Sequence, residues 1–430
     1  MLERLFKLSE YGTNVRTEII AGLTTFLTMA YIIFVNPAIL ADTGMDRDAV
    51  FVATCLAAAI GCFIMGFVAN YPIAQAPGMG LNAFFTYSVV LGMGYTWQVA
   101  LAAVFCSGIL FVLLSVFRIR EWIINSIPLA LRTGISAGIG LFLAFVALKN
   151  AGIVVDNPAT LLSLGHVNSH QVVLAAIGFF LTIALVHRGI KGAVLFAILG
   201  VTVLGLIFGD VKWGGVMSTP PSLAPTFMQL DFSGIFEVGM ISVVFAFLFV
   251  DLFDTAGTLV GVATKANLVT EDGKIPRLNK ALLADSTATS VGALLGTSNT
   301  TSFVESTAGV AVGGRTGLTA VVVGILFILA LFFSPLAGMI PPYATAGALL
   351  YVAILMMSGL VGIDWRDITE AAPVVVTCLM MPFSFSIAEG ISFGFITYAA
   401  IKALSGKGRD VSLSVWVMSA IFLLKYIFAG

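Results

Sequence analysis

The sequence predicts an all-α polytopic membrane protein, and its composition, its long apolar runs and two broken apolar segments each indicate this class. The chain has 430 residues, of which 59% are hydrophobic and 10% are charged, and its mean hydropathy is +1.06. Soluble proteins carry about 25% charged residues. A chain this apolar has too few polar residues to cover the surface of a soluble protein. In a lipid bilayer the surface can be apolar, so the composition indicates a membrane protein.

The apolar runs give the predicted membrane spans. A spanning helix needs about 20 predominantly apolar residues, and the clear candidates are 17–41, 48–69, 96–117, 129–149, 169–187, 193–209, 235–262, 316–338, 343–361 and 387–404. Four further segments are short, polar or interrupted by glycine and proline: 73–93, 278–297, 298–314 and 371–385. Counting them gives fourteen crossings. On that count the last stretch, 412–428, lies at the membrane interface; the alternative is a further span.

Loop charges predict the orientation. Basic residues gather in alternate loops, at Arg4, Lys7, Arg16, Arg118, Arg120, His187, Arg188, Lys191, Lys265, Lys274, Arg277, Lys280, Arg315, Arg366, Lys402, Lys407 and Arg409. The positive-inside rule then places the N-terminus in the cytoplasm. No cleavage site follows the first apolar run near Ile19, so we expect that run to remain as a span. The net charge of −1 does not indicate a nucleic-acid partner.

A faint internal repeat relates the two halves. A shift of 230 residues matches Thr25 with Thr255, Thr28 with Thr258, Gly66 with Gly296 and Gln75 with Glu305. Seven crossings per half is an odd number, so the two halves are predicted to be inverted. Both halves carry a broken segment at the corresponding place, which is the sequence pointer to the binding site of a transporter.

The first broken segment, residues 71–85, contains Pro72, Pro77 and Gly78, which do not support a continuous helix. Broken backbone at membrane depth is tolerated only where it is buried in protein or lines a wet cavity. A half-helix starting after Pro77 would direct free N–H groups at that cavity, and Asn82 adds a donor and an acceptor. The alternative is a kink that only lets helices pack closely.

The second broken segment, residues 296–310, is rich in hydroxyl groups, including Thr301 and Ser302, and carries one carboxylate, Glu305. An ionisable side chain inside a membrane costs roughly 2.5–3.5 kcal/mol on insertion scales. The nearest basic residue along the chain is Arg315. We therefore expect Glu305 to be functional; the alternative is a salt bridge to a lysine of another helix.

Two more acids, Asp251 and Asp254, lie near the middle of the predicted span 235–262. Three residues apart on a helix, they are neighbours on one face. Each disfavours the charge of the other, and burial acts in the same direction, so at least one should bind a proton near neutral pH, as proton coupling requires. The alternative is that hydroxyls such as Thr255 and Thr258 neutralise both. Asp285 is predicted to tie a short helix to its neighbour.

The sequence predicts no enzyme. It contains no HExxH, GxSxG, Walker A or dinucleotide-binding pattern. The four cysteines form no CxxC or zinc-type spacing, and the three histidines fall in or next to predicted loops, so we expect no metal site. The absence of a nucleotide motif argues against an ATP-driven pump. Glu389, near a helix start, is predicted to be structural.

Five stretches carry a resemblance to a known family. They are GLTTFLTMAYIIFVNP (22–37), APGMGLNAFF (76–85), LFDTAGTL (252–259), NTTSFVESTAGVAVGGRTGLTA (299–320) and PPYATAGALL (341–350). These stretches resemble the AzgA-type purine permeases of the nucleobase–ascorbate transporter superfamily, and the resemblance covers essentially the whole chain.

The resemblance implies a fold of fourteen transmembrane segments in two inverted repeats of seven. In each repeat the first four segments form a core domain and the last three a gate domain, and segments three and ten are half strand and half helix. By position, the core domain takes residues 17–117 and 233–338. The gate domain takes 118–232 and 339–430, the latter including the C-terminal helix.

The resemblance also implies the site. The substrate would lie between segments three and ten, near the membrane midplane. Predicted substrate-binding residues are Glu305, Asn82, Asp254, Asp251, Gln75, Phe84, Phe303, Ser302 and Thr301, and predicted proton-coupling residues are Asp254, Glu305 and Asp251. Asp251 aligns with a position at which not all relatives are acidic. The two phenylalanines are placed to stack on or cradle a flat ring.

The implied activity is import of purine nucleobases in symport with protons across the cytoplasmic (inner) membrane, with no cofactor beyond the coupling proton. The stretches FRIREWIINSIP (117–128) and MMPFSFSIAEG (380–390) resemble adenine-type members more closely. Guanine/hypoxanthine-type members share the core motifs, so that specificity is the alternative. An anion transporter or channel on the same fold is another, although several acids in the site argue against a bound anion. Membrane lipid is the expected surrounding, and many relatives are homodimers.

Overall fold

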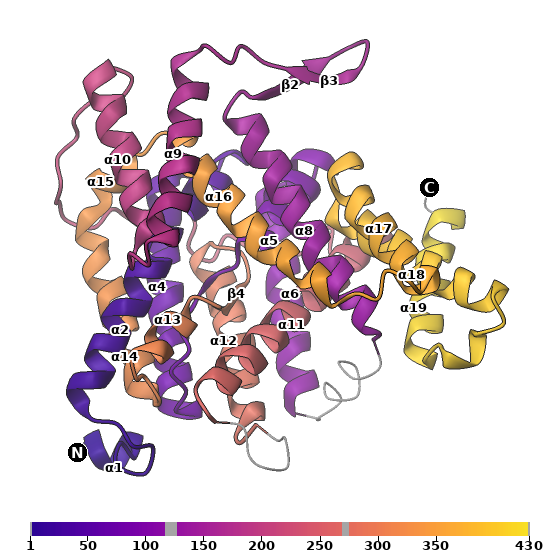
Figure 1. Ribbon diagram of the computed structural model, residues 1–430, viewed down its shortest axis with the longest axis horizontal. Coiled ribbons are helices and arrows are strands. Elements are labelled where there is room, and N and C mark those ends of the chain that lie inside the picture. Colours follow the sequence, from indigo (N-terminus) through magenta and orange to yellow (C-terminus); the bar gives the residue numbers. More distant parts are fainter. Residues whose placement is uncertain (1, 117–126, 269–274, 429–430) are drawn as a thin grey trace.

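The computed structural model describes residues 2–116, 127–268 and 275–428. Most of the FRIREWIINSIP stretch and the loop residues Arg118, Arg120 and Lys274 lie outside the described residues. Within them the chain is mostly helical, with two small two-stranded sheets (Figure 1). The predicted all-α class is confirmed, and the count of fourteen crossings stays a prediction.

The first half of the chain consists of nine α-helices, two π-helical turns and three short strands among the described residues. They are α1 (Leu2–Phe6), α2 (Val15–Met29), α3 (Ile32–Ala41), α4 (Arg47–Ile64), η1 (Met65–Ala69), β1 (Gln75–Pro77), α5 (Met79–Ala83), η2 (Phe84–Gly92), α6 (Trp97–Val116), α8 (Leu129–Asn150), β2 (Val154–Asn157), β3 (Leu161–Leu164), α9 (His170–His187) and α10 (Ala193–Phe208).

The second half begins with a long helix and has one short strand among the described residues. Its elements are α11 (Val238–Lys265), α12 (Leu278–Leu295), β4 (Thr300–Ser302), α13 (Ser306–Ala311), α14 (Gly317–Ala330), η3 (Leu331–Phe333), α15 (Ser334–Met339), α16 (Pro342–Met357), η4 (Ser358–Gly362), α17 (Ile368–Phe383), α18 (Ile387–Leu404), η5 (Gly408–Asp410) and α19 (Leu413–Phe428).

Most predicted spans are helices of suitable length. Within the described residues, nine helices or helix pairs are long and apolar enough to cross a membrane, and shorter apolar helices lie at 79–92, 193–208, 368–383 and 413–424. The polar segment predicted at 278–297 is the helix α12. The last predicted stretch is α19, which packs beside α18 at the edge of the molecule (Figure 1). Whether α19 spans or lies at the interface stays a prediction.

Both broken segments have the predicted form, a short strand followed by a half-helix. Pro77 ends β1, Gly78 precedes α5, and β4 is separated from α13 by three residues. The two strands pair antiparallel, with Gln75 opposite Ser302 and Ala76 opposite Thr301. This pairing satisfies backbone groups that lipid would leave unpaired. Segments from the two halves of the sequence therefore meet inside the molecule, where Figure 1 shows β4 among the surrounding helices.

The repeat is present in the architecture, but the shift of 230 residues does not hold at the broken segments. Strands β1 and β4 begin at residues 75 and 300, which are 225 apart, and the half-helices begin at 79 and 306, which are 227 apart. Gln75 therefore corresponds to Thr300 rather than to Glu305. The links between equivalent elements differ in length, so no single shift aligns the halves.

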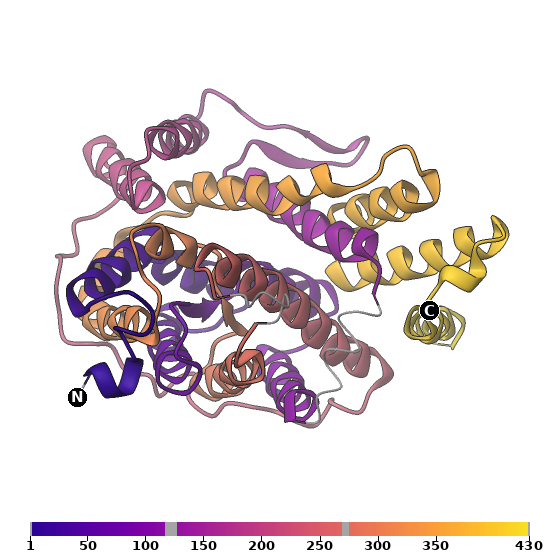
Figure 2. The same cartoon turned by 60° about the horizontal axis from the view of Figure 1, so that its bottom comes forward.

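The helices pack in two groups. In the first group, α4 packs against α12 and α14, α6 against α11 and α12, and α14 against α2. In the second, α16 packs against α8, α9 and α10, and α17 against α8 and α18. Figure 2 shows the orange α16 and α17 running beside the magenta α8. The two groups contact each other through several pairs of elements, among them α11 with α8 and α18, α2 with α10, and α5 with α8.

A buried carboxylate that the sequence analysis did not single out fixes α2 to α14. The Glu18 carboxylate accepts the backbone N–H groups of Arg315 (2.8 Å), Thr316 (3.3 Å) and Thr319 (3.2 Å), and the Thr319 hydroxyl (2.6 Å). These N–H groups stand at the start of α14, where a helix leaves donors unpaired and favours negative charge.

Glu389 lies in the first turn of α18, as predicted, and accepts a hydrogen bond from the Tyr426 hydroxyl.

Candidate functional site

Glu305 stands directly before α13, at the junction of the second broken segment, and is half-buried. The Tyr31 hydroxyl donates a hydrogen bond to its Oε1 atom at 2.5 Å. Ion pairs among the described residues join Lys7 to Glu10, Lys402 to Glu370 and Lys407 to Asp367, and none of them involves Glu305. The salt-bridge alternative for this acid therefore finds no support among the described residues.

Asn82 lies fully buried in α5, the half-helix of the first broken segment. Its Oδ1 atom accepts a hydrogen bond from the Ser298 hydroxyl. Its Nδ2 group has no hydrogen-bond partner among the described residues. A buried donor left unpaired costs about 1–3 kcal/mol, so this amide is suited to donate to a bound ligand.

The neighbouring acids of α11 have different surroundings. Asp251 is fully buried, and its Oδ2 atom accepts from the Thr289 hydroxyl (3.0 Å) and from Asn299 Nδ2 (3.0 Å). Asp254, one turn further, keeps an accessible side chain and has the carboxylates of Asp251 and Glu305 as electrostatic neighbours. Of the two, only Asp254 faces open space in this conformation.

The hydroxyl of Thr255, which was considered a partner for these acids, binds elsewhere. It donates to Asp285 Oδ2 at 2.8 Å and lies 2.7 Å from the Thr301 hydroxyl. Helices α11 and α12 are thereby joined twice, once by Thr255 to Asp285 and once by Thr289 to Asp251. The two bonds are reciprocal, because each helix contributes one acid and, four residues later, one threonine.

Asp285 is the centre of this buried network. Its carboxylate also accepts from the Ser302 hydroxyl (2.9 Å) and from Gln75 Nε2 (3.1 Å). The network thus holds β1 and β4 against α11 and α12, and Asp285 has the tying role predicted for it. The predicted site residues Gln75, Thr301 and Ser302 are all buried here. They therefore stabilise the place where β1 and β4 pair, here called the strand crossing.

The two aromatic residues of the predicted site are also buried. Phe84 is fully buried and packs edge to face against Phe247, with ring centroids 4.8 Å apart. Phe303 is 6% exposed. Between Phe303 and Glu305, the side chain of Val304 is 46% exposed. In this conformation Val304, rather than either ring, is the exposed apolar side chain adjacent to Glu305 in the chain.

One face of α11 is open from the site to the helix end at Lys265. Asp254, Gly257 and Gly261 lie on this face, at the spacing of successive helical turns, and all three are accessible. A Cβ atom added at either glycine would meet nothing within 4 Å. Toward the other end of α11 the same face is buried, at Val243, Phe247 and Val250.

Hydrogen bonds of η2 also link the two helix groups. The Tyr87 hydroxyl accepts from Asn150 Nδ2 (3.1 Å) and donates to Asp42 Oδ2 (2.8 Å), and the Ser88 hydroxyl donates to the Phe385 carbonyl (3.2 Å). Tyr87 and Ser88 belong to η2, whereas Asn150 ends α8 and Phe385 lies between α17 and α18. These contacts fasten α8 and the α17–α18 link to η2.

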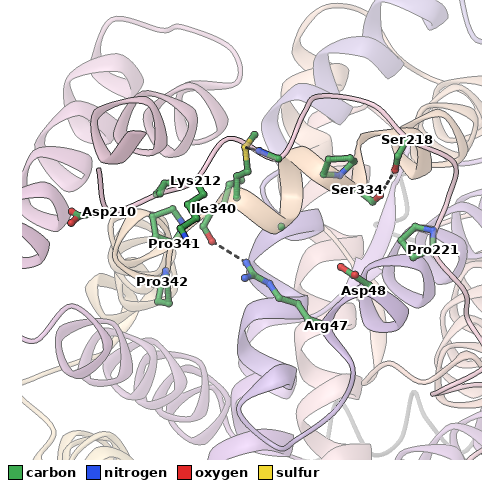
Figure 3. A pocket seen from close by; sticks show the side chains of 15 residues that line it. Arg47, Asp48, Asp210, Lys212, Ser218, Pro221, Ser334, Ile340, Pro341 and Pro342 are labelled. Atoms are coloured by element: carbon green, nitrogen blue, oxygen red, sulfur yellow. Dashed lines mark hydrogen bonds between the residues drawn. The ribbon is translucent and has the colours of Figure 1, made fainter. Parts of the chain in front are cut away.

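A cavity of about 620 Å³ lies near the start of α4, beneath the loop that follows α10. Arg47 Nη2 donates a hydrogen bond to the Ile340 carbonyl across the cavity at 2.9 Å (Figure 3). The hydroxyls of Ser218 and Ser334 form a hydrogen bond with each other at 3.0 Å. None of the nine predicted site residues lines this cavity. It is separate from the strand crossing.

Sequence reasoning missed Tyr31, the one described side chain that hydrogen-bonds the Glu305 carboxylate. The available signal was a phenol inside the otherwise apolar run YIIFV, directly after the threonine-rich stretch that was singled out. A phenolic hydroxyl within a membrane span needs a partner, and Glu305 supplies it.

Comparisons with known proteins agree with this architecture. Residues 16–393 match the model of the Permease family named Xan_ur_permease. The adenine permease AdeP of Escherichia coli is 53% identical over 428 residues, covering 100% of this chain and 96% of the relative. The guanine/hypoxanthine permease PbuG of Bacillus subtilis is 48% identical, covering 99% of this chain and 100% of the relative.

Among solved structures, the transmembrane domain of a cyanobacterium bicarbonate transporter, BicA, superposes with a TM-score of 0.64 at 16% identity, covering 90% of this chain and 97% of that chain. At this identity the likeness shows the shared fold, the 7+7 inverted-repeat transporter fold. The resemblance to AzgA-type permeases is confirmed by the family match and by the relatives. The chain is therefore a membrane transporter, not an enzyme, and belongs to the permease family of nucleobase–ascorbate transporters.

Proposed function

We propose that this protein imports purine nucleobases across the cytoplasmic membrane in symport with protons, with adenine as the preferred base. The observation that carries the proposal is the placement of the unpaired Asn82 amide and of Glu305 at the two half-helices that follow the paired strands β1 and β4, with Asp254 within electrostatic range of Glu305. The identity to the adenine permease AdeP, 53%, exceeds the identity to PbuG, 48%. This difference favours adenine over guanine and hypoxanthine.

The polar groups suit the edge of a purine. A purine presents ring N–H donors beside ring nitrogen acceptors. A carboxylate can accept from the N–H group while an amide N–H donates to the ring nitrogen. The second oxygen of Glu305 would accept a ring N–H, and Asn82 Nδ2 would donate to a ring nitrogen. A site that hydrogen-bonds its substrate rejects analogues lacking the matching group, because its own buried groups would be left unpaired.

Asp254 is our candidate for the proton site. Its side chain is accessible, and two further carboxylates lie within electrostatic range. A proton on Asp254 would remove its repulsion with Asp251 and with Glu305, so proton binding and substrate binding at Glu305 would be coupled. One proton crossing about 100 mV supplies roughly 2.3 kcal/mol, enough for a roughly 50-fold gradient of a neutral base.

The basic loops predict which side of the membrane the accessible face of α11 leads to. The positive-inside rule puts Lys265 and the N-terminus in the cytoplasm, so the accessible face of α11 would lead to the cytoplasm and the structure would be inward-facing. We assign the first helix group to the core domain and the second to the gate domain. The contacts of Tyr87 and Ser88 would then close the outer side.

Anion transport is the alternative that the shared fold leaves, since BicA is a bicarbonate transporter. The charges at the site disfavour it. Glu305, Asp254 and Asp251 would each repel an anion, and no lysine or arginine forms an ion pair with Glu305 among the described residues. A neutral base lacks that penalty.

Ligand-dependent stability of the purified protein separates these functions. A ligand that binds only the folded state stabilises it by RT ln(1 + [L]/Kd), about 2.7 kcal/mol at 100 times Kd. We expect adenine to raise the unfolding midpoint most, followed by hypoxanthine and guanine, with no effect of bicarbonate, sulfate or uracil. Stabilisation by an anion, with none by any purine, would replace this proposal with anion transport.

A further inference from the structure

The first transmembrane segment is interrupted next to the site. Helix α2 ends at Met29 and α3 begins at Ile32, and Tyr31 stands in the break. Its side chain is 1% exposed, so the ring is held in the interior. Its hydroxyl points at Glu305 Oε1, 2.5 Å away. A phenol fixed by its own packing can fix the group to which it donates.

Close packing holds the two partners in one unit. A Cβ atom at Gly309 of α13 would lie 2.2 Å from Thr25 Oγ1 and 2.6 Å from the carbonyl oxygen of Ala21, so α13 rests directly on α2. The Thr28 hydroxyl lies 3.5 Å from the Glu305 carbonyl. The bond from Tyr31 to Glu305 therefore joins two segments that are already docked, and little ordering entropy opposes it.

The other side of Glu305 faces the second helix group. Tyr351 of α16 lies within electrostatic range of Glu305 and is half-buried. Among the described side chains only Tyr31 hydrogen-bonds the carboxylate, and it occupies Oε1. No described side chain donates to the Oε2 atom, and the neighbouring residues Val304 and Asp254 are accessible.

We infer that Tyr31 is a positioning residue for substrate recognition, acting through Glu305. This inference rests on the proposed function, in which Glu305 binds the base. By donating to Oε1, the hydroxyl fixes the rotation of the carboxylate and keeps it an acceptor, so that Oε2 meets a ring N–H of the substrate. A hydrogen bond to a charged group is among the stronger ones in proteins. Without it the carboxylate would sample several rotamers.

The test compares two isosteric variants, Tyr31→Phe and Tyr71→Phe. Tyr71 is a matched control, because it is also fully buried and its hydroxyl donates to the Pro276 carbonyl, away from Glu305. We expect Tyr31→Phe to raise the apparent KM for adenine uptake roughly tenfold while the maximal rate changes little. Tyr71→Phe should leave KM unchanged. Equal KM for wild type and Tyr31→Phe would overturn the inference.

A double-mutant cycle with Glu305→Gln separates positioning from general packing. If Tyr31 acts through Glu305, adding Tyr31→Phe to Glu305→Gln should change adenine affinity less than about twofold, far from the product of the two single effects. Independent, multiplicative effects would assign Tyr31 to another role. The pH dependence of KM should also shift in Tyr31→Phe and not in Tyr71→Phe, since only the former removes a donor to a titratable group.

The same four proteins distinguish failure of this inference from failure of the proposed function. If wild type binds no purine, the proposed function is wrong. The unfolding midpoints of the ligand-free proteins then measure the coupling between Tyr31 and Glu305 directly. If wild type binds purines but neither affinity nor midpoint shows coupling, the proposed function stands and the positioning role of Tyr31 is wrong.

Discussion

At the scale of single residues, four acids with similar apolar sequence contexts have different surroundings. Asp251 and Asp285 are fully buried and accept hydrogen bonds from threonine, serine and amide side chains, whereas Asp254 is accessible and Glu305 is half-buried. Sequence reasoning identified all four as requiring an explanation, because a charge in a membrane is costly. It could not predict which of the four acids are buried and hydrogen-bonded and which are accessible, since their partners come from other helices.

Asp254→Asn should separate coupling from transport. The amide cannot take up the proton, so we expect exchange of labelled for unlabelled adenine to continue while accumulation against a gradient is lost. Counterflow and net uptake in proteoliposomes measure the two properties. Asp231→Asn, in an exposed loop, is the control and should retain both. Accumulation by Asp254→Asn at the wild-type level would remove Asp254 as the proton site.

Asp285→Asn should affect folding instead. The new amide N–H₂ group would face the donors Thr255, Ser302 and Gln75, leaving buried groups unpaired at roughly 1–3 kcal/mol each. We expect a lower unfolding midpoint in detergent for Asp285→Asn than for Asp254→Asn, whose side chain is accessible. The reverse order of midpoints would contradict the structural role of Asp285.

At the scale of elements, the broken segments were predictable and their partnership was not. Pro77 and the glycine- and hydroxyl-rich runs exclude continuous helices, so the sequence places both breaks. The pairing of Gln75 with Ser302 depends on how far each strand extends and on the links around it. Aligning the two halves with one fixed shift of 230 residues misplaced the second strand and half-helix by three to five residues. That misalignment matched Gln75 with Glu305.

The docking of α13 on α2 depends on Gly309. Alanine there would place its Cβ 2.6 Å from the backbone oxygen of Ala21, which cannot rotate away. We expect Gly309→Ala to lower the unfolding midpoint and to weaken adenine binding, because Glu305 moves with α13. Gly338→Ala in α15 meets nothing within 4 Å and should be neutral or stabilising by up to about 1 kcal/mol. Equal behaviour of the two variants would show that this contact is unimportant.

At the scale of the whole molecule, the burial pattern along one face of α11 differs between the two ends of the helix. The same helical face is buried at Val250 and accessible from Asp254 to Gly261. The sequence predicts the helix, its acids and the inverted repeats, but not this asymmetry. An alternating-access transporter has at least two packings of one sequence, and their free energies differ by a few kcal/mol, so local patterns cannot select between them.

Thiol labelling tests this state. In a background without the four native cysteines, we expect Gly257→Cys to react with a membrane-impermeant maleimide added from the cytoplasmic side of inverted vesicles. Val250→Cys, two turns away on the same face, should be protected. Bound adenine should slow the reaction at residue 257. Labelling of residue 250 with protection of residue 257 would mean that the resting protein opens to the other side.

The central claim is that the acids at the strand crossing couple proton entry to purine import. The most direct measurement is uptake of labelled adenine by cells expressing this protein, with and without a protonophore, in competition with guanine, hypoxanthine, xanthine and uracil. We predict uptake that the protonophore abolishes, that unlabelled adenine blocks most strongly among the purines, and that uracil leaves unchanged. Absence of uptake of any base by protein shown to be folded in the membrane would contradict the account, and protonophore-insensitive adenine uptake would contradict its coupling mechanism.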